Sequence, residues 1–193
     1  MLNPMNLGRR RLLAASGTAT LSAAAATLLA GCAPGMAVAK PSETSKDVDI
    51  LNVALSLEHE AINAYQLGAQ SGLLQKPVLD VAVLFQSHHK GHRDALIATI
   101  EKLGGRPVAE KSVAEYAKDL RAQMLKSQAD VLDLATRLEL GAANAYLGVI
   151  PSFRDANLAK VAARLAADES MHWTTLTGGL GRRLPSAALS FGA

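Results

Sequence analysis

The sequence of 193 residues is poor in cysteine and in aromatic residues, and each shortage excludes a class of site. The single cysteine, Cys32, cannot form an internal disulfide, and it cannot build the thiolate clusters that hold structural zinc or iron–sulfur centres. Only 4% of the residues are aromatic, which leaves few rings to stack on bases or sugars. A metal site in this chain therefore has to use His, Asp and Glu.

The body of the chain also lacks net charge. Arg9, Arg10 and Arg11 account for the formal charge of +3, because the other 17 basic residues are matched by 17 acidic residues. A neutral body argues against nucleic-acid binding. The sequence contains no nucleophile elbow, phosphate loop or dinucleotide-binding glycine motif. At this length, 49% hydrophobic residues suffice for one well-buried domain.

Residues 1–31 have the pattern of an export signal. Three arginines precede an uncharged, Ala-rich run from Leu12 to Ala30. The pair Arg9-Arg10, followed after one residue by two leucines, resembles the twin-arginine signal, which exports folded proteins across the bacterial inner membrane. The alternative is an ordinary secretory signal that happens to contain several arginines.

Two processing sites compete after this signal. Residues 29–32, Leu-Ala-Gly-Cys, resemble a lipobox, in which Cys32 is lipidated and anchors the mature protein to a membrane. Cleavage after Ala39 would instead release a soluble periplasmic protein without Cys32. Residues 32–46 are rich in Pro, Gly and Ser, which indicates a flexible tether. We therefore expect a protein of the periplasm or cell envelope, with the lipid anchor favoured.

The remainder predicts an all-α bundle, because apolar residues recur at helical spacing and no segment alternates like a strand. The four expected helices span residues 47–73, 77–103, 128–150 and 155–177. The connection between the second and third is too long for a tight turn, so we expect a crossover that holds a short helix over 113–125. The bundle domain is then 47–178, followed by a C-terminal extension over 179–193.

The sequence contains an internal repeat. Residues 57–65, LEHEAINAY, match residues 138–146, LELGAANAY, at six of nine positions, 81 residues apart. Residues 88–92, HHKGH, correspond to residues 168–172, DESMH, 80 residues apart. The two helical hairpins are therefore expected to be related by a pseudo-twofold axis, with a site built between them.

Ionisable residues interrupt the apolar stripe of every predicted helix. At steps of three and four residues, an acid or histidine falls on the core-facing side of each helix. These residues are Glu58, His89, His92, Glu139, Glu169 and His172. Buried carboxylates are costly and repel one another, and a divalent cation removes both penalties. The alternative is a metal-free core in which histidines and tyrosines satisfy the acids by hydrogen bonds.

This pattern resembles the ferritin-like superfamily, in which one Glu from each of two helices and a Glu-x-x-His from each of the other two bind two metals. The opening Asp49-Ile50-Leu51-Asn52 and Leu57-Glu58 are similar to its bacterial exported, desiccation-related branch. The resemblance implies a ferritin-like four-helix bundle made of two hairpins with a crossover. It implies that Glu58 and Glu139 are terminal carboxylates, that Glu169 and His172 form one Glu-x-x-His, and that His92 completes the other.

One position departs from that pattern: His89 stands where the family has a glutamate that usually bridges the two metals. An imidazole does not bridge as a carboxylate does, so a mononuclear site is as consistent with the sequence as a dinuclear one. Fe or Mn is the favoured ion and Zn the alternative. Glu60 is set aside as a replacement acid, because it points about 200° away from Glu58 on an ideal helix. Tyr65 and Tyr146 are expected to be core packing.

Three classes of function remain open from the sequence. The first is an envelope metal-binding protein which, if it is an enzyme, is a metal-dependent oxidoreductase that oxidises iron or disposes of peroxide in a stress response. The second is a metal-free ferritin-like protein with a structural or desiccation-protective role. The third is a partner-binding bundle. A homodimer is compatible with each of them.

Overall fold

The computed structural model describes residues 43–192 as an all-α protein. Its α-helices are α1 (Glu43–Gln70), α2 (Lys76–Lys102), α3 (Val113–Asp119), α4 (Gln128–Val149) and α5 (Ala156–Gly179), with two short 3-10 turns, η1 (Ala122–Met124) and η2 (Ile150–Ser152). The predicted signal peptide, Cys32, the two processing sites and most of the predicted tether lie outside the described residues.

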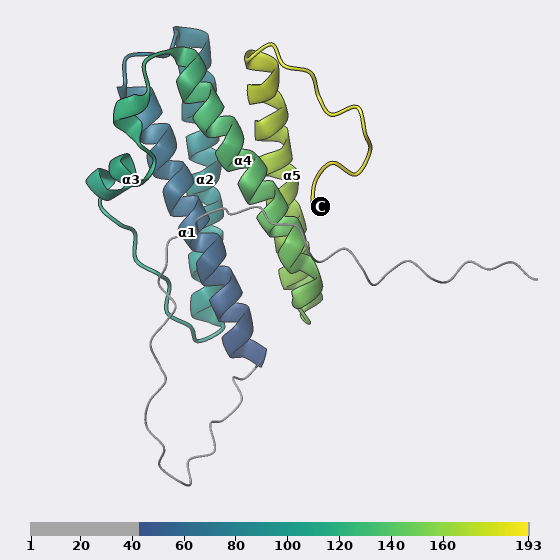
Figure 1. Cartoon of the computed structure of the whole chain (residues 1–193). Helices are drawn as coiled ribbons and strands as arrows, with labels where there is room; N and C mark the ends of the chain where they lie inside the picture. Colours follow the sequence, from purple (N-terminus) through teal and green to yellow (C-terminus); the bar gives the residue numbers. More distant parts are fainter. Residues whose placement is uncertain (1–42, 193) are drawn as a thin grey trace, which may run out of the picture. The chain divides into compact units, whose positions relative to one another are not determined.

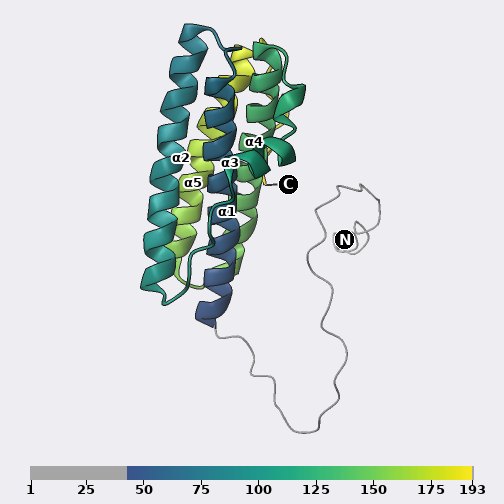
Figure 2. The same cartoon turned by 90° about the vertical axis from the view of Figure 1, so that its left-hand side faces the viewer.

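The four long helices form two antiparallel hairpins, α1–α2 and α4–α5 (Figure 1). The two hairpins pack together through α1 and α4. Because α2 ends at the opposite end of the bundle from the start of α4, the chain between them has to return along its length. Residues 103–127 make this crossover and carry α3 along the outside of α1 (Figure 2). The all-α fold predicted from the sequence is confirmed.

Local signals in the sequence set the helix ends. Pro77 lies in the first turn of α2, where its missing N–H costs no hydrogen bond. Gly104 follows that helix with a φ of 76°, a left-handed conformation that glycine adopts without strain. Ser127 and Asp155 cap α4 and α5 by accepting hydrogen bonds from the backbone N–H groups of Asp130 and Asn157.

Two predicted boundaries are wrong. Helix α1 begins at Glu43, four residues earlier than expected and inside the predicted tether. The short helix predicted over 113–125 ends at Asp119, and the chain then turns through Arg121, which has a φ of 53°. A continuous helix would place Met124 beside the buried Leu120. The break instead brings Leu125 onto that apolar cluster and leaves Met124 exposed.

The core consists of two apolar layers separated by a polar one. The lower layer contains Leu55, Leu96 and Ile100, together with leucines of α5. The upper layer contains Tyr65, Phe85, Leu132 and Leu176 among others. In α1 the chain passes from Leu55 through Glu58 to Tyr65, so Glu58 lies between the two layers. The predicted site therefore occupies a level of the bundle that apolar side chains close above and below.

Two outer segments are tied to the bundle by the repeated asparagine. In the first half, the Asn63 amide donates to Glu110 of the crossover at 2.6 Å. In the second half, Asn144 accepts from the backbone N–H of Gly192 at 2.8 Å, which anchors the C-terminal extension. The Phe191 ring also meets Trp173 of α5 edge to face at 5.2 Å between centroids. Both hairpins are thus followed by a segment that folds back along the first helix of its own half.

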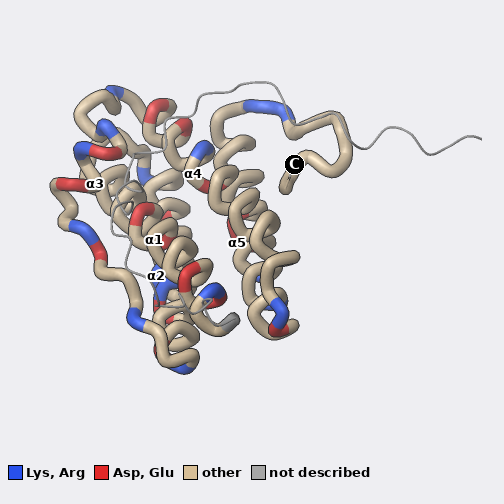
Figure 3. Tube along the Cα trace, turned by 60° about the horizontal axis from the view of Figure 1, so that its bottom comes forward, with Lys and Arg blue, Asp and Glu red and all other residues tan. Residues whose placement is uncertain are grey.

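The outer surface carries charges of both signs. Figure 3 shows basic and acidic residues interspersed along the helices and the crossover. No helix among residues 43–192 is long and apolar enough to span a membrane.

Candidate metal centre

The polar layer brings together side chains from all four long helices. The six residues predicted as ligands meet there: Glu58 from α1, His89 and His92 from α2, Glu139 from α4, and Glu169 and His172 from α5. Five of them are 0–2% exposed, and the His92 side chain is 11% exposed. Three carboxylates at this depth need compensating positive charge or strong hydrogen bonds.

His89 lies at the centre of the cluster. Its Nδ1 is 2.8 Å from Glu58 Oε2 and its Nε2 is 3.2 Å from Glu139 Oε1, so each ring nitrogen faces a carboxylate. Burial alone would lower the pKa of His89, but hydrogen bonds to Glu139 and Glu58 raise it well above its ordinary value. Without metal, His89 is therefore an imidazolium that donates to both acids and serves as their internal counterion.

Glu169 lies between the two halves and is the least satisfied of the acids. It is 0% exposed, yet neither of its carboxylate oxygens makes a hydrogen bond within the described part of the chain. Its oxygens lie 3.3 Å from His92 Nδ1 and 3.4 Å from His172 Nδ1. Burial and the neighbouring carboxylate of Glu139 raise the pKa of Glu169. Two buried oxygens without donors are the kind of group that binds a cation.

The ligand atoms fall into two overlapping sets. One set contains Glu58, His89, His92 and Glu169, and the other contains His89, Glu139, Glu169 and His172. Within each set the donor atoms lie within 4.8 Å of one another. His89 and Glu169 belong to both sets. Oxygen and imidazole donors in this number suit Fe, Mn or Zn, so the residues present fit a divalent transition metal.

His92 and His172 are each oriented by a hydrogen-bond partner on the opposite helix. His92 Nε2 lies 3.1 Å from Asp168 Oδ2, and His172 Nε2 lies 2.9 Å from His88 Nδ1. In both rings Nδ1 is left facing the cluster. A hydrogen bond to the outer nitrogen fixes the tautomer and the ring orientation of a histidine ligand. The acceptor is a carboxylate for His92 and an imidazole for His172, so the two halves are not equivalent.

Each of the two repeated tyrosines forms a hydrogen bond with the glutamate of the other half. Tyr65 of α1 donates to Glu139 of α4, and Tyr146 of α4 donates to Glu58 of α1. Burial and these carboxylates raise the pKa of both hydroxyls well above the ordinary value. The prediction that these tyrosines are only core packing is therefore wrong. The signal was present, because each tyrosine follows its glutamate by seven residues and so shares its helix face.

In the first half, the pKa values of Glu58 and His92 are shifted in opposite directions. Burial would raise the pKa of Glu58, but the hydrogen bond from His89 and the nearby ring of His92 lower it to about 2. Burial would lower the pKa of His92, but Glu169 and Glu58 raise it to about 10. Both groups are therefore charged near neutral pH without metal. The centre is then a closely balanced arrangement of acids and imidazolium groups.

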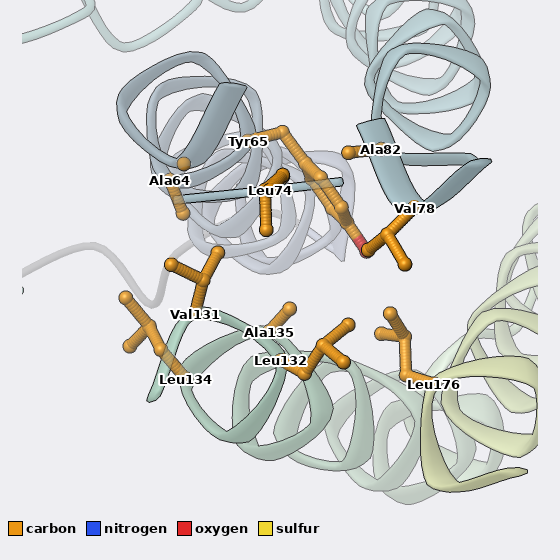
Figure 4. Close-up of a pocket in the computed structure, with 11 residues that line it drawn as sticks. Ala64, Tyr65, Leu74, Val78, Ala82, Val131, Leu132, Leu134, Ala135 and Leu176 are labelled. Atoms are coloured by element: carbon orange, nitrogen blue, oxygen red, sulfur yellow. The ribbon is translucent and has the colours of Figure 1, made fainter. Parts of the chain in front are cut away.

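An apolar layer closes the centre on the side of the α1–α2 turn. Figure 4 shows Tyr65, Ala82, Leu132 and Leu176 among the side chains around a cavity of about 20 Å³ at this level. The hydroxyl of Tyr65 is bound to Glu139, so the cavity presents carbon to its interior. Such a layer excludes water and charge from this end of the cluster.

Four residues that were not predicted as ligands surround the predicted ligands: Tyr65, Tyr146, His88 and Asp168. His88 and Asp168 occupy the same position of the repeat, and each reaches a histidine of the other half. An outward-pointing position on a helix predicts a surface residue when the neighbouring helix is ignored. Their contacts depend on how close α2 and α5 lie, which the sequence pattern of either helix does not specify.

Known structures share this architecture. A crystal structure of a conserved hypothetical protein from Mycobacterium tuberculosis is similar with a TM-score of 0.61 and 24% identity, covering 77% of this chain and 99% of that one. The bacterioferritin-related protein of Bacteroides fragilis, described as a dodecameric thioferritin, is similar with a TM-score of 0.61 and 19% identity, covering 72% of this chain and 86% of that one. At these identities the likeness concerns the fold. No curated protein matches the sequence significantly.

The family model for the ferritin-like domain matches residues 46–182, which include all but the first three residues of the two hairpins, the crossover and all six predicted ligands. The chain belongs to the ferritin-like domain family.

Proposed function

We propose that this protein binds one or two divalent transition-metal ions in the core of the bundle. The observation that carries the proposal is the buried Glu169: neither of its carboxylate oxygens makes a hydrogen bond within residues 43–192, and ring nitrogens of His92 and His172 face it at 3.3 and 3.4 Å. Burying a carboxylate in this state is costly unless a cation accepts its lone pairs. The proposed ligands are Glu58, His89, His92, Glu139, Glu169 and His172.

A bound Fe or Mn ion would supply redox chemistry, and we propose oxidation of iron or disposal of peroxide as the reaction. The residues of the chain hold the ion, exclude bulk water and keep protons at defined atoms. Tyr65 and Tyr146 donate hydrogen bonds to Glu139 and Glu58, and Asp168 and His88 hold the outer nitrogens of His92 and His172. A Zn ion in the same ligands would support binding without redox turnover.

Elemental analysis of the purified protein tests the proposal, with Glu169→Gln as the variant and Glu101→Gln as its control. Glu169→Gln keeps the shape of the side chain but removes the charge at the centre. Glu101 is an exposed acid near the end of α2, so its substitution makes the same change of charge elsewhere. We expect one or two ions per chain in the wild type and in the control, and none in Glu169→Gln. Equal metal content in all three proteins would overturn the proposal.

A second candidate function is a metal-free, structural or desiccation-protective bundle. Its support is His89, which already neutralises Glu58 and Glu139 through hydrogen bonds at 2.8 and 3.2 Å. In this case the wild type would contain no metal, would take up none when offered Fe, Mn or Zn, and would show the same thermal unfolding midpoint with and without them. A rise in the midpoint on addition of metal would eliminate this candidate, because a ligand that binds the native state stabilises it.

We further propose that the protein is exported by the twin-arginine pathway as part of the exported, desiccation-related branch, and that lipidated Cys32 tethers it to the cell envelope. The support is in residues 1–39 of the sequence. Replacing Arg9 and Arg10 by lysine should retain the protein in the cytoplasm, and Cys32→Ala should move it from the membrane to the soluble fraction. Membrane association that survives Cys32→Ala would overturn the anchor.

We propose a homodimer as the assembly. The similar B. fragilis protein is a dodecamer, so a mass measurement in solution separates the two outcomes clearly. A mass of about 40 kDa, twice the chain mass of 20.2 kDa, would support the dimer, and a twelvefold mass would overturn it.

A further inference from the structure

A small cavity between α1 and α4 leads toward the metal centre. It has a volume of about 30 Å³, which is enough for a water molecule. Its outer part is lined by the half-buried Glu60, together with the apolar side chains of Leu57, Ala61, Leu138 and Ala142. Its inner part is lined by the buried His89 and Glu139. The cavity therefore joins the partly exposed surface of the bundle to two of the proposed ligands.

The other directions of approach are less favourable for a cation. The layers above and below the centre are apolar, and a charged ion crosses such layers only at high cost. On the α2/α5 side the ring of His92 is hydrogen-bonded to Asp168, and the ring of His172 to His88. Asp168, the acid on this side, is therefore already engaged with His92. The α1/α4 side instead combines a cavity with an acidic side chain, Glu60, that has no hydrogen-bond partner within residues 43–192.

Glu60 is the only ionisable residue lining this cavity that is not one of the proposed ligands. It makes no hydrogen bond or ion pair within residues 43–192. The charges that act on it are those of Lys111, Asp119 and Arg137. Lys111 and Asp119 are paired with each other at 2.9 Å, so Arg137 is the remaining positive charge. Glu60 is thus a carboxylate free to take a ligand, at the mouth of the cavity.

We propose that the α1/α4 cavity is the passage by which divalent cations reach the centre, with Glu60 as the carboxylate that takes the ion from solvent and delivers it toward Glu139 and His89. The inference rests on the proposed metal-binding function and adds a route and a residue to it. Helix geometry placed Glu60 away from Glu58, which is correct. That same direction points it to the α1/α4 side, where the cavity opens.

The test is the rate of metal uptake, measured by stopped-flow absorbance with Co²⁺ as the probe. Glu60→Gln should slow association about tenfold, because a single acid at the mouth of a narrow passage concentrates the cation. The number of ions bound at equilibrium should stay unchanged. Arg137→Gln should have the opposite effect and speed association, since it removes the nearby positive charge. Glu101→Gln is the matched control and should bind at the wild-type rate.

Two further variants separate this route from its competitor. Ala142→Leu should narrow the passage and slow both uptake and release without changing the number of ions bound. A wild-type rate in Glu60→Gln, or a rate that falls in Asp168→Asn but not in Glu60→Gln, would overturn the passage and place entry between α2 and α5. Failure of the wild type to bind Co²⁺ at all would instead overturn the proposed function, which distinguishes the two failures.

Discussion

The two hairpins of this protein share a plan and differ in their charged residues. At corresponding positions, α2 presents His88, His89 and His92, whereas α5 presents Asp168, Glu169 and His172. The first half therefore supplies imidazoles where the second half supplies acids. In the bundle these unlike groups face one another: His89 lies among the carboxylates, and His92 meets Asp168. The comparison shows that the extra imidazoles of the first half compensate the extra acids of the second half.

Making the two halves alike should have the largest effect. His89→Glu restores a Glu-x-x-His in α2, but it also replaces the central imidazolium by a fourth acid. We expect the metal-free variant to lose about 3–5 kcal/mol of unfolding free energy, the cost of breaking a buried ion pair. With metal it should regain stability and bind two ions per chain. Denaturant unfolding with and without metal, together with elemental analysis, measures both effects.

His89→Gln is the control for that experiment, because it removes the cation without adding an acid. It should be destabilised but should not gain an ion. If metal-free His89→Glu were as stable as the wild type, His89 would not be the counterion of Glu58 and Glu139.

The outer hydrogen bonds of the two terminal histidines should differ in importance. Asp168→Asn replaces a charged acceptor of His92 by a neutral one, and we expect metal affinity to fall about 10–100-fold. His88→Gln changes a neutral acceptor of His172 to another neutral group, so its effect should be smaller. Competition with a chromophoric chelator gives both affinities. Equal losses would mean that the charge of the acceptor is not what distinguishes the halves.

The exchanged tyrosines should behave alike, which makes them a test of the symmetry. Tyr65→Phe and Tyr146→Phe each remove a donor from a buried carboxylate, at an expected cost of about 1–3 kcal/mol in unfolding free energy. Equilibrium denaturation of the two variants in the metal-free state provides the comparison. A cost confined to one of them would show that Glu58 and Glu139 are held differently despite the repeat.

A change of pH alters the charges of Glu58 and His92 without a change of sequence. The pKa of Glu58 is lowered to about 2, so its contribution to stability is present above its ordinary 4.5 and is lost as the pH falls toward 2. The pKa of His92 is raised to about 10, so its contribution is complete below its ordinary 6.5 and is lost as the pH rises toward 10.

For these two groups, the metal-free protein should be most stable between about pH 4.5 and 6.5. Metal competes with protons for His92 and the carboxylates, so the optimum of the metal-loaded protein should lie at higher pH. Thermal unfolding midpoints of the metal-free and metal-loaded forms across pH 4–9 measure this shift in the pH of maximum stability. Superimposable pH profiles would contradict it.

The sequence predicted the bundle well because its signals are local and repeated. Apolar spacing, Pro77, Gly104 and the caps Ser127 and Asp155 determine where helices start and stop. The six candidate ligands could be singled out because an acid or histidine on an apolar stripe must face the core. The break at Arg121 was missed because it depends on which side chain, Met124 or Leu125, reaches a cluster formed by distant residues.

The sequence by itself determined four helices, two related hairpins and six ionisable side chains aimed inward, since these follow from helical period and from the repeat. Only the tertiary structure decided which partners these side chains meet. The distance between α2 and α5 lets Asp168 and His88 reach across to the histidines, the packing of α1 on α4 exchanges the tyrosines, and the same packing leaves the cavity at Glu60. A helix pattern fixes the direction of a side chain, whereas its contacts depend on the separation and register of the neighbouring helices.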